Sequence, residues 1–349
     1  MSSLFPTISK FSIIGVGSIG KFIAHSVRKS YPDVEIDLFM SNQDAVKEFK
    51  SNGNQITAFS TTHGTTSKSE NYNCLSIQDN VEPGSFIIVA TKAGQVIQVL
   101  EKIKSLVVAS PSRILLLQNG LGIINQINSN IWPEESTRPH ILYGINTHGI
   151  TSTTRNSIEI RGQGSIRYAN IPNPKRQDSQ AHKISQVLSN MTQLAIANVS
   201  YETFVEEQFC KFVVNCCINP LTALYDCDNG QIVAVDLLRQ ICQSIISEIV
   251  AVSDGLPELQ VLQPEQQKLL VRDENLMKSV INVAKLTSRN MSSMRADVIQ
   301  GRQTEIDHLN GFVASLAKNI GRQAPVCELL TLMIKTAVLR QKGWESKVA

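Results

Sequence analysis

A glycine-rich turn near the start of the chain, at Gly15, Gly17 and Gly20, constrains the fold more than any other stretch. It follows a short apolar run at residues 11–14 and precedes a helical pattern at residues 21–30. In a strand, turn and helix of this kind, the first glycine permits a tight turn and the second lets a pyrophosphate approach the backbone. The third lets the helix pack closely on the strand. The N–H groups and partial positive charge at the helix N-terminus favour phosphates.

These features predict an N-terminal Rossmann-type dinucleotide-binding domain of the α/β class. The predicted cofactor contacts in the turn are Gly15, Gly17, Ser18, Ile19 and Gly20. The alternative interpretation is a glycine turn that serves only the packing of strand and helix.

The end of the next predicted strand, residues 34–40, bears on which dinucleotide binds. NAD enzymes usually carry Asp or Glu there, about 20 residues after the glycines, to bind the ribose hydroxyls. Here the strand is followed by Ser41 and Asn42, and Asp37 lies inside the strand, before its end. No acid at the strand end would repel a 2′-phosphate, and Ser41, Asn42 and Lys47 could receive it. We therefore predict NADP, bound as NADPH, with Ser41 as a contact.

Two continuous apolar runs, residues 85–90 and 113–117, are typical of buried parallel strands. The first is followed by Lys92 and Gln95, and the second by Asn119. Ligands of open parallel sheets bind at the carboxyl ends of the strands. Lys92 and Asn119 are therefore predicted to face nicotinamide and substrate, and the alternative for each is a loop residue in water.

The rest of the first domain is predicted from shorter patterns. Residues 57–73 are polar and predict a loop or irregular edge strands, and residues 141–146 predict a strand that is followed by His148. Residues 158–160 and 165–168 alternate in polarity and are predicted to pair as antiparallel strands that close the sheet. His148 could approach the site, although a single histidine is more often structural.

From residue 202 onward only helical periodicity remains, so the predicted domains are 1–202 and an all-α domain at 203–349. Residues 207–225 carry Lys211, Asn215 and Asn219 at i, i+4 and i+8, which drift only about 40° per step and so share one face. The residues between them are nearly all apolar, which predicts a buried helix. Polar groups on such a helix need polar partners or a ligand, and the alternative is a polar stripe that faces water.

Pro220 is predicted to bend or end this helix, because proline removes a backbone donor. Further helices are predicted at residues 231–253, 264–284, 303–320 and 325–341. In the third of these, Glu305 shares a stripe with Leu309 and Phe312, which predicts a partly buried carboxylate. Such a carboxylate needs a partner such as Lys211 or a ligand hydroxyl. The alternative is a first-turn Glu that complements the helix dipole.

Composition narrows the class of partner. The formal net charge of +3 is spread along 349 residues without a basic run, which argues against a nucleic-acid surface. No apolar run approaches the roughly 18 residues of a membrane span, and the position of the glycine turn leaves no room for a cleaved leader. Seven cysteines form no C-x-x-C pair and indicate reduced thiols, so we predict a cytoplasmic protein without a metal site.

Residues 226–230 faintly resemble the start of a calcium loop, but the twelfth position is Leu237 rather than Glu, so they predict a turn that caps the next helix.

Five sequence blocks occur in order along the chain. They are GVGSIG at 15–20, TKAGQ at 91–95, NGLG at 119–122, KFVVNCCINPLT at 211–222, and SSM at 292–294 with TEIDHLNG at 304–311. Together they resemble the ketopantoate reductase family, the NADPH-dependent 2-dehydropantoate 2-reductases of pantothenate and coenzyme A biosynthesis. The resemblance spans roughly residues 11–342, and its last two blocks are more specific than the glycine turn. It implies a Rossmann domain followed by an all-helical domain like the C-terminal domain of 6-phosphogluconate dehydrogenase, with the active site in the cleft.

By position, the resemblance implies that Lys211 is the catalytic general acid and that Glu305 binds the hydroxyl side of the substrate. It implies substrate contacts at Asn215, Asn219, Ser293, Asn290 and Asn119, and cofactor contacts at Lys92, Gln95 and Asn119. The chain departs from the family at one position, because Ser41 stands where an Arg often binds the 2′-phosphate.

The implied reaction is the NADPH-dependent reduction of 2-dehydropantoate to pantoate, with hydride transfer to the C2 ketone of this small 2-oxo acid. One alternative is the reduction of a different 2-oxo acid or ketone by the same apparatus. Another is a non-catalytic NADP-binding sensor, which would not need Lys211, Asn215, Asn219, Ser293 and Glu305 together. The oligomeric state stays open, and a homodimer through an exposed apolar stripe of the helical domain is one option.

Overall fold

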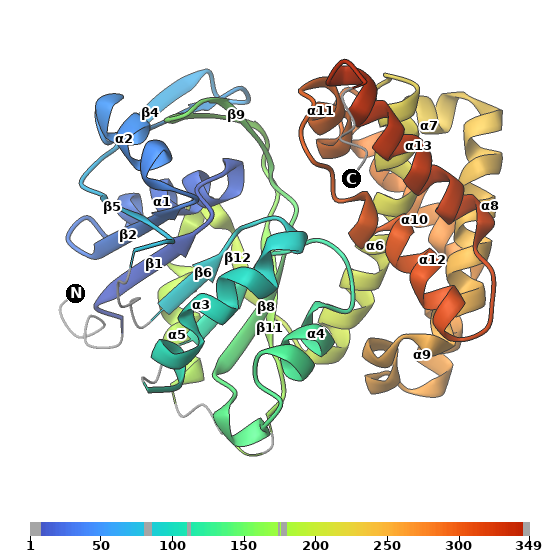
Figure 1. Ribbon diagram of the computed structural model, residues 1–349, viewed down its shortest axis with the longest axis horizontal. Helices are drawn as coiled ribbons and strands as arrows, with labels where there is room; N and C mark the ends of the chain where they lie inside the picture. Colours follow the sequence, from blue (N-terminus) through green and yellow to red (C-terminus); the bar gives the residue numbers. More distant parts are fainter. Residues whose placement is uncertain (1–7, 80–85, 110–112, 174, 176–179, 345–349) are drawn as a thin grey trace. The chain divides into compact units, whose positions relative to one another are not determined.

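The computed structural model describes residues 8–79, 86–109, 113–173, 175 and 180–344. The chain forms two compact units, one α/β and one helical (Figure 1). The first comprises Met1–Gln118 and Ile124–Phe204, and the second comprises Asn119–Ile123 and Val205–Ala349. The short segment Asn119–Ile123 is therefore built into the helical unit, although the sequence assigned it to the first domain. Residue 85, the first of one predicted strand, lies outside the described residues.

The α/β unit is built on an eight-stranded sheet with the strand order β12-β11-β8-β7-β6-β1-β2-β5. Its strands are β1 (Lys10–Ile14), β2 (Glu35–Met40), β5 (Asn73–Ser76), β6 (Phe86–Val89), β7 (Arg113–Leu116), β8 (His140–Asn146), β11 (Ile166–Asn170) and β12 (Ile196–Asn198). Six neighbouring strands, β8, β7, β6, β1, β2 and β5, are parallel to one another. β11 runs antiparallel to β8. β6 and β7 are buried along their whole length, as expected for parallel strands covered on both faces. After β1 the chain continues to its neighbour β2 on one side, and after β6 it continues to its neighbour β7 on the other side. At such a reversal of strand order a ligand crevice is expected, here at the carboxyl ends of β1 and β6.

Helix α1 (Ser18–Ser30) contacts strands of this sheet and of a second, four-stranded sheet. The second sheet has the order β4-β3-β10-β9 and consists of β3 (Ile56–Ser60), β4 (Thr65–Ser69), β9 (Gly149–Thr154) and β10 (Ser157–Gly162). Because α1 is covered from two sides, residues 20–27 are all buried, including the polar Lys21 and His25. The other helices of this unit are α2 (Gln43–Ser51), α3 (Val96–Ala109), α4 (Ile123–Asn130) and α5 (Ala181–Ser189).

One prediction for the strands of this unit is wrong. Residues 158–160 and 165–168 do not pair with each other, because β10 pairs with β3 and β9 in the second sheet, whereas β11 pairs with β8 in the first. Alternating polarity identifies the buried face of a strand but does not say which strand lies beside it. Residues 57–73, predicted as a loop or edge strands, contain the β3–β4 hairpin, and β4 is an edge strand.

The buried Lys21 side chain ties the second sheet to α1. Its Nζ donates to the carbonyl oxygens of Thr154, at the end of β9, and Arg155, in the turn that follows, at 3.0 and 3.1 Å. Burial, and secondarily the charge of Arg155, lowers the pKa of Lys21 to about 8. Carbonyl oxygens at a strand turn thus satisfy an ammonium group that would otherwise be costly to bury.

His25 is buried on the same helix. Its Nδ1 lies 2.6 Å from the Ser69 Oγ and its Nε2 lies 2.8 Å from the Ser67 Oγ, both on β4. Burial, followed by the charge of Lys29, lowers the pKa of His25 to about 4. The ring is therefore neutral at pH 7 and joins α1 to the second sheet through two serine hydroxyls.

The neutral His25 predicts a loss of stability in mild acid. An unfolded histidine has a pKa of about 6.5, so as the pH falls, protons bind to the unfolded chain before they bind to the folded one. The neutral His25 therefore contributes to the free energy of unfolding, and this contribution is fully present above the pKa of the unfolded histidine. It is lost as the pH falls toward 4, and the loss between pH 7.5 and 5 amounts to about 2 kcal/mol. Urea denaturation of the wild type and His25→Gln at both pH values measures it, with the exposed His63→Gln as control. The same pH dependence in wild type and His25→Gln would contradict the prediction.

The helical unit carries most of α6 (Tyr201–Leu224), together with α7 (Gln231–Ala234), α8 (Asp236–Val252), α9 (Pro264–Leu270), α10 (Asp273–Leu286), α11 (Ser293–Ile299), α12 (Asn310–Asn319) and α13 (Pro325–Gln341). The division between the two units falls within α6, after Phe204. Two of the predicted long helices are interrupted, because the pattern at 231–253 divides into α7 and α8 and the pattern at 264–284 divides into α9 and α10. No helix among the described residues is long and apolar enough to cross a membrane.

Pro220 lies inside α6 and does not end it, because the helix continues to Leu224. Proline has no N–H, so the carbonyl group of Cys216 lacks its usual helical donor. The Asn310 Nδ2 donates to this carbonyl at 3.1 Å instead, and Asn310 is fully buried. A side chain from α12 thus completes the hydrogen bonding of α6 where the proline interrupts it.

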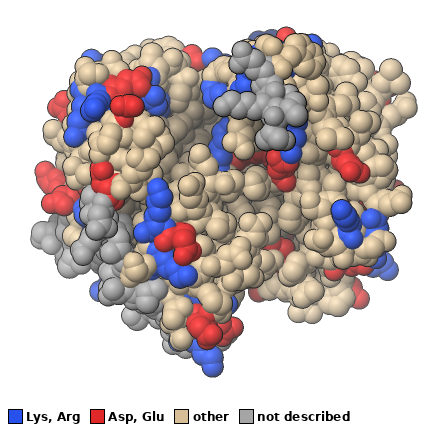
Figure 2. All heavy atoms as spheres, viewed as in Figure 1, with Lys and Arg blue, Asp and Glu red and all other residues tan. Residues whose placement is uncertain are grey.

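Charged side chains of both signs are interspersed with uncharged ones on the face shown in Figure 2. All seven cysteines are free thiols, and five of them are buried. Among the residues that the structure describes, no group of three or more His, Cys, Asp or Glu side chains is arranged to hold a metal ion.

Candidate functional site

The glycine turn lies between β1 and α1, at the carboxyl end of the strand. Gly15 has φ +94°, and a Cβ atom there would lie 2.7 Å from the backbone nitrogen of Thr91. A Cβ atom on Gly20 would lie 2.0 Å from the carbonyl oxygen of Gly15, so neither position accepts a side chain without a shift of the backbone. A Cβ atom on Gly17 would meet no atom within 4 Å, which means that the space beside Gly17 is open.

Helix α1 begins at this open space. Its first helical hydrogen bond runs from the Lys21 N–H to the Gly17 carbonyl at 3.0 Å, and the N–H groups of Ser18, Ile19 and Gly20 precede it. Donors in the first turn of a helix have no partner within that helix, and the first turn of α1 contains no acidic residue. The open space, the donors and the helix dipole together fit a pyrophosphate group.

Ser18 also bonds to the second sheet. The Ser152 N–H donates to the Ser18 Oγ at 3.1 Å, and the two hydroxyl oxygens lie 3.0 Å apart. Ser152 belongs to β9, so this strand reaches the first turn of α1. No local sequence pattern links the two residues, because they are 134 positions apart.

The residues that follow β2, which bear on whether NAD or NADP binds, differ in the contacts of their side chains. Ser41 is exposed directly after β2, whereas the Asn42 side chain accepts a backbone N–H at 2.9 Å and caps α2. Asp37 is buried within β2, where its carboxylate lies 3.0 Å from the Lys10 Nζ. Ser41 and Asn42 are both exposed, but the Asn42 side chain is engaged in the cap of α2, and Asp37 is buried.

Lys92 and Gln95 both follow the carboxyl end of β6, where the sequence places them. Lys92 is half-buried and precedes the 3₁₀ turn η1 (Ala93–Gln95), and Gln95 at the end of that turn is exposed. Their predicted roles toward a nicotinamide stay predictions.

His148 has a structural role within the α/β unit. Its Nδ1 accepts from the Gly164 N–H at 3.0 Å, so the Nε2 carries the proton that is donated to the Leu194 carbonyl at 2.9 Å. The ring lies edge-on to Phe22 with 4.9 Å between ring centres, and burial lowers its pKa. Both nitrogens bind backbone groups, which accounts for a buried histidine without a catalytic role.

Three of the predicted site residues meet within the helical unit. The Lys211 Nζ donates to the Asn119 Oδ1 at 2.8 Å, and the Asn119 Nδ2 donates to the Glu305 Oε2 at 2.9 Å. All three side chains are half-buried. The amide group of Asn119 therefore bridges an ammonium group from α6 and a carboxylate that precedes the 3₁₀ turn η6 (Ile306–His308).

The position of Glu305 differs from the predicted one. The helix expected at 303–320 begins only at Asn310, and Leu309 departs from helical geometry with φ −114° and ψ −103°. Glu305 therefore does not share a helical stripe with Phe312, and its carboxylate instead accepts a hydrogen bond from Asn119. Helical spacing could not reveal this, because a 3₁₀ turn and a non-helical residue change the direction of every side chain before α12.

The surroundings of Lys211 lower the pKa of its ammonium group toward neutral pH. Burial lowers the pKa of Lys211 to about 8, and the charge of Glu305 acts in the opposite direction. An ammonium group with such a pKa stays protonated at pH 7 and gives up its proton more easily than an exposed lysine.

The other predicted substrate residues lie in the same unit. Asn215 and Asn219 continue the face of α6 that carries Lys211, the first half-buried and the second buried. Ser293 is the exposed first residue of α11, and Asn290 lies just before that helix. Their substrate contacts stay predictions.

Ser292, the neighbour of Ser293, was not singled out from the sequence. It is buried, and its hydroxyl accepts from the Thr222 Oγ1 at 2.7 Å and from the Arg295 N–H at 3.1 Å. It thereby caps α11 and joins this helix to α6. A serine that directly precedes a helical pattern was the signal available for it.

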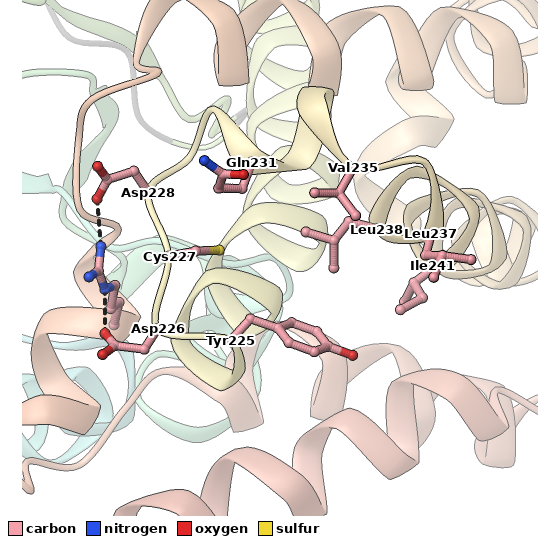
Figure 3. A pocket seen from close by; sticks show the side chains of 10 residues that line it. Tyr225, Asp226, Cys227, Asp228, Gln231, Val235, Leu237, Leu238 and Ile241 are labelled. Atoms are coloured by element: carbon pink, nitrogen blue, oxygen red, sulfur yellow. Dashed lines mark hydrogen bonds and ion pairs between the residues drawn. The ribbon is translucent and has the colours of Figure 1, made fainter.

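Residues 226–230 form a turn, but its carboxylates do not cap the next helix. Asp226 and Asp228 bind the Arg295 guanidinium at 2.8 and 2.6 Å (Figure 3). A pocket of about 470 Å³ opens beside this ion pair. Its lining comprises Tyr225, Asp226, Cys227, Asp228, Gln231, Val235, Leu237, Leu238, Ile241 and Arg295. None of the predicted catalytic, substrate or cofactor residues lines it.

Comparison with known proteins identifies the family and the fold. The family model described as ketopantoate reductase PanE/ApbA matches residues 11–173, and the model described as its C-terminal part matches residues 203–338. A relative from Schizosaccharomyces pombe, named as a probable 2-dehydropantoate 2-reductase, is 29% identical over 338 residues. The match covers 93% of this chain and 95% of the relative.

Solved structures share the fold. The probable 2-dehydropantoate 2-reductase panE from Bacillus subtilis is 25% identical with a TM-score of 0.70, and the match covers 94% of this chain and 99% of that one. A ternary structure of D-mandelate dehydrogenase with NADH and anilino(oxo)acetate has a TM-score of 0.77 at 19% identity, covering 95% of this chain and 99% of that one. These likenesses confirm the predicted α/β domain followed by an all-helical domain. With both family models matched in order along its length, the chain belongs to the ketopantoate reductase family of oxidoreductases.

Proposed function

We propose that this protein reduces 2-dehydropantoate to pantoate with NADPH, as a step of pantothenate and coenzyme A biosynthesis. Family membership and the name of the Schizosaccharomyces pombe relative support this substrate. The observation that carries the proposal is the hydrogen-bonded set of Lys211, Asn119 and Glu305. It combines a cation suited to a carbonyl oxygen with an amide and a carboxylate that hold the cation in place.

Lys211 is the proposed general acid. Negative charge accumulates on the carbonyl oxygen when the C2 ketone accepts a hydride. An ammonium group within hydrogen-bond reach stabilises that charge and then donates the proton that completes the alcohol. Glu305 raises the pKa of Lys211 through its charge, and we propose that its carboxylate accepts a substrate hydroxyl.

The α/β unit is proposed to bind the dinucleotide, which supplies the hydride when bound. The N–H groups of Ser18, Ile19 and Gly20 would hold the pyrophosphate beside the open space at Gly17. Ser41, exposed after β2, would contact the 2′-phosphate. Lys92 and Gln95 follow the carboxyl end of β6, where nicotinamide contacts are expected.

The pKa of Lys211 predicts the alkaline limit of the reaction. We expect kcat/KM, which reports the ionisation of the free enzyme, to fall above pH 8 by about tenfold per pH unit, because a deprotonated amine has no proton to donate. Since the charge of Glu305 raises this pKa, Glu305→Gln is expected to move the limit to lower pH, and Glu305→Asp, which keeps the charge, to move it less. The measurement is the pH profile of kcat/KM for the three proteins. An unchanged limit in Glu305→Gln would mean that Lys211 is not the titrating group.

The substrate is tested by NADPH oxidation with the purified protein. 2-Dehydropantoate is compared with a series of other 2-oxo acids, and NADH replaces NADPH as the control for cofactor choice. The proposal predicts that kcat/KM is highest for 2-dehydropantoate with NADPH. A higher kcat/KM for another 2-oxo acid would assign a different substrate to the same residues, and NADPH binding without turnover of any ketone would favour a sensor.

A further inference from the structure

The segment Asn119–Ile123, called the strap below, is held in the helical unit by two side chains that bind its backbone. The Gln208 Nε2 donates to the Gly120 carbonyl at 3.3 Å, and the Glu258 Oε1 accepts from the Gly122 N–H at 2.8 Å. Gln208 lies on α6 and is buried, and Glu258 lies in the 3₁₀ turn η5 (Pro257–Val261). One carbonyl group and one N–H group of the strap are thus hydrogen-bonded by side chains from two different elements of the unit.

The backbone of the strap lies directly against the unit that holds it. Gly120 has φ +97°, and a Cβ atom there would lie 2.8 Å from the His308 carbonyl oxygen. Gly122 has φ +77°, and a Cβ atom there would lie 2.8 Å from the Phe312 ring. Both glycines are required for their backbone conformation and for the close approach, so the path of the strap is closely defined.

Asn119 is the first residue of the strap, and its amide makes the bridge between Lys211 and Glu305. The bridge has one workable orientation, because the amide oxygen must accept from the ammonium group and the amide nitrogen must donate to the carboxylate. Gln208 precedes Lys211 by about one turn of α6, so one helix bonds to both Gly120 and Asn119. A shift of the strap would therefore displace the amide relative to both charged groups.

We propose that Gln208 and Glu258 are positioning residues, which fix the strap so that Asn119 keeps the Lys211 ammonium and the Glu305 carboxylate in place for proton transfer. Neither side chain is assigned a contact with substrate or cofactor. The inference rests on the proposed function for the role of Lys211, but it does not depend on which 2-oxo acid is reduced. Misplacement of a catalytic group lowers the rate of the chemical step more than it weakens substrate binding.

The kinetic test compares Glu258→Ala and Gln208→Ala with the wild type. For each we expect kcat to fall by about tenfold or more while KM changes less than kcat does. Glu258→Gln keeps an oxygen that can accept the Gly122 N–H and is expected to recover most of the loss. The control is Glu248→Ala, since Glu248 also accepts backbone N–H groups, from Val326 and Cys327 at 2.7 and 2.9 Å, but at the start of α13. This control is expected to lower thermal stability with kcat unchanged.

A second readout follows the strap itself. Amide hydrogen exchange, measured by mass spectrometry on peptides that cover residues 119–123, is expected to be faster by about tenfold in Glu258→Ala than in the wild type and in Glu248→Ala. Faster exchange with unchanged kcat would overturn the positioning role, and unchanged exchange would show that Glu258 does not hold the strap. If the wild type does not reduce 2-dehydropantoate, the proposed substrate fails, while the exchange result still decides whether Glu258 fixes the strap.

Discussion

Replacing Lys211 by methionine is expected to lower kcat for the reduction of a 2-oxo acid by about 10²–10⁴-fold, the usual contribution of general acid catalysis. Methionine is unbranched like lysine and fills a similar space, but it has no proton to donate and no charge to oppose the developing oxyanion. The substitution also removes the 2.8 Å hydrogen bond to the Asn119 Oδ1. Dinucleotide affinity is expected to stay the same, because the glycine turn belongs to the α/β unit and Lys211 to the helical one.

Steady-state kinetics and titration of NADPH fluorescence measure these two quantities separately. The matched control is Lys318→Met, because Lys318 is an exposed lysine on α12 of the same unit. Turnover close to wild type in Lys211→Met would refute the assignment of Lys211 as the general acid. A loss of both turnover and NADPH affinity would instead indicate a disturbed fold.

Gly20→Ala is expected to lower both NADPH affinity and thermal stability. The new methyl group would lie 2.0 Å from the Gly15 carbonyl oxygen, so the glycine turn or the start of α1 must move. Forcing a methyl group into a close-packed site typically costs about 1–3 kcal/mol of folding free energy. Displacement of the N–H groups that are proposed to bind the phosphates is expected to weaken NADPH binding by about tenfold to a hundredfold, or about 1.4 kcal/mol for each factor of ten.

Gly17→Ala is the matched variant that distinguishes an effect on NADPH binding from an effect on folding stability. Its methyl group would meet no atom of the protein within 4 Å, and φ −80° is accessible to alanine, so the melting temperature is expected to stay unchanged. If a pyrophosphate occupies that space, NADPH affinity falls in Gly17→Ala as well. Calorimetry and fluorescence titration of both variants provide the measurements. Unchanged NADPH affinity in Gly17→Ala would place the phosphates elsewhere.

Short-range patterns were sufficient for the elements nearest the site. The apolar run before Gly15 forms β1, and the stretch at 207–225 lies almost entirely within α6, with Lys211, Asn215 and Asn219 at helical spacing. Each of these depends on residues only a few positions apart, so a local pattern carries the information. The fold class was predictable for a related reason, since strands and helices in alternation followed by helices alone allow few architectures.

Contacts between distant residues were not predictable in this way. The resemblance implied a role for Asn119, but nothing in the local sequence indicates that its amide lies between Lys211, 92 positions later, and Glu305, 186 positions later. The same is true of β10, which pairs in the second sheet rather than with β11. His148 likewise received its structural role from backbone groups of Gly164 and Leu194.

The amino-acid order alone thus defined an α/β domain followed by a helical one, the glycine turn, and the chemical types that a reductase site needs. These features follow from local backbone preferences and from the period of apolar residues along each element. The Lys211–Asn119–Glu305 bridge, the strap and the second sheet were settled by tertiary packing. Their free energies come from hydrogen bonds and burial among residues that become neighbours only when the chain has folded.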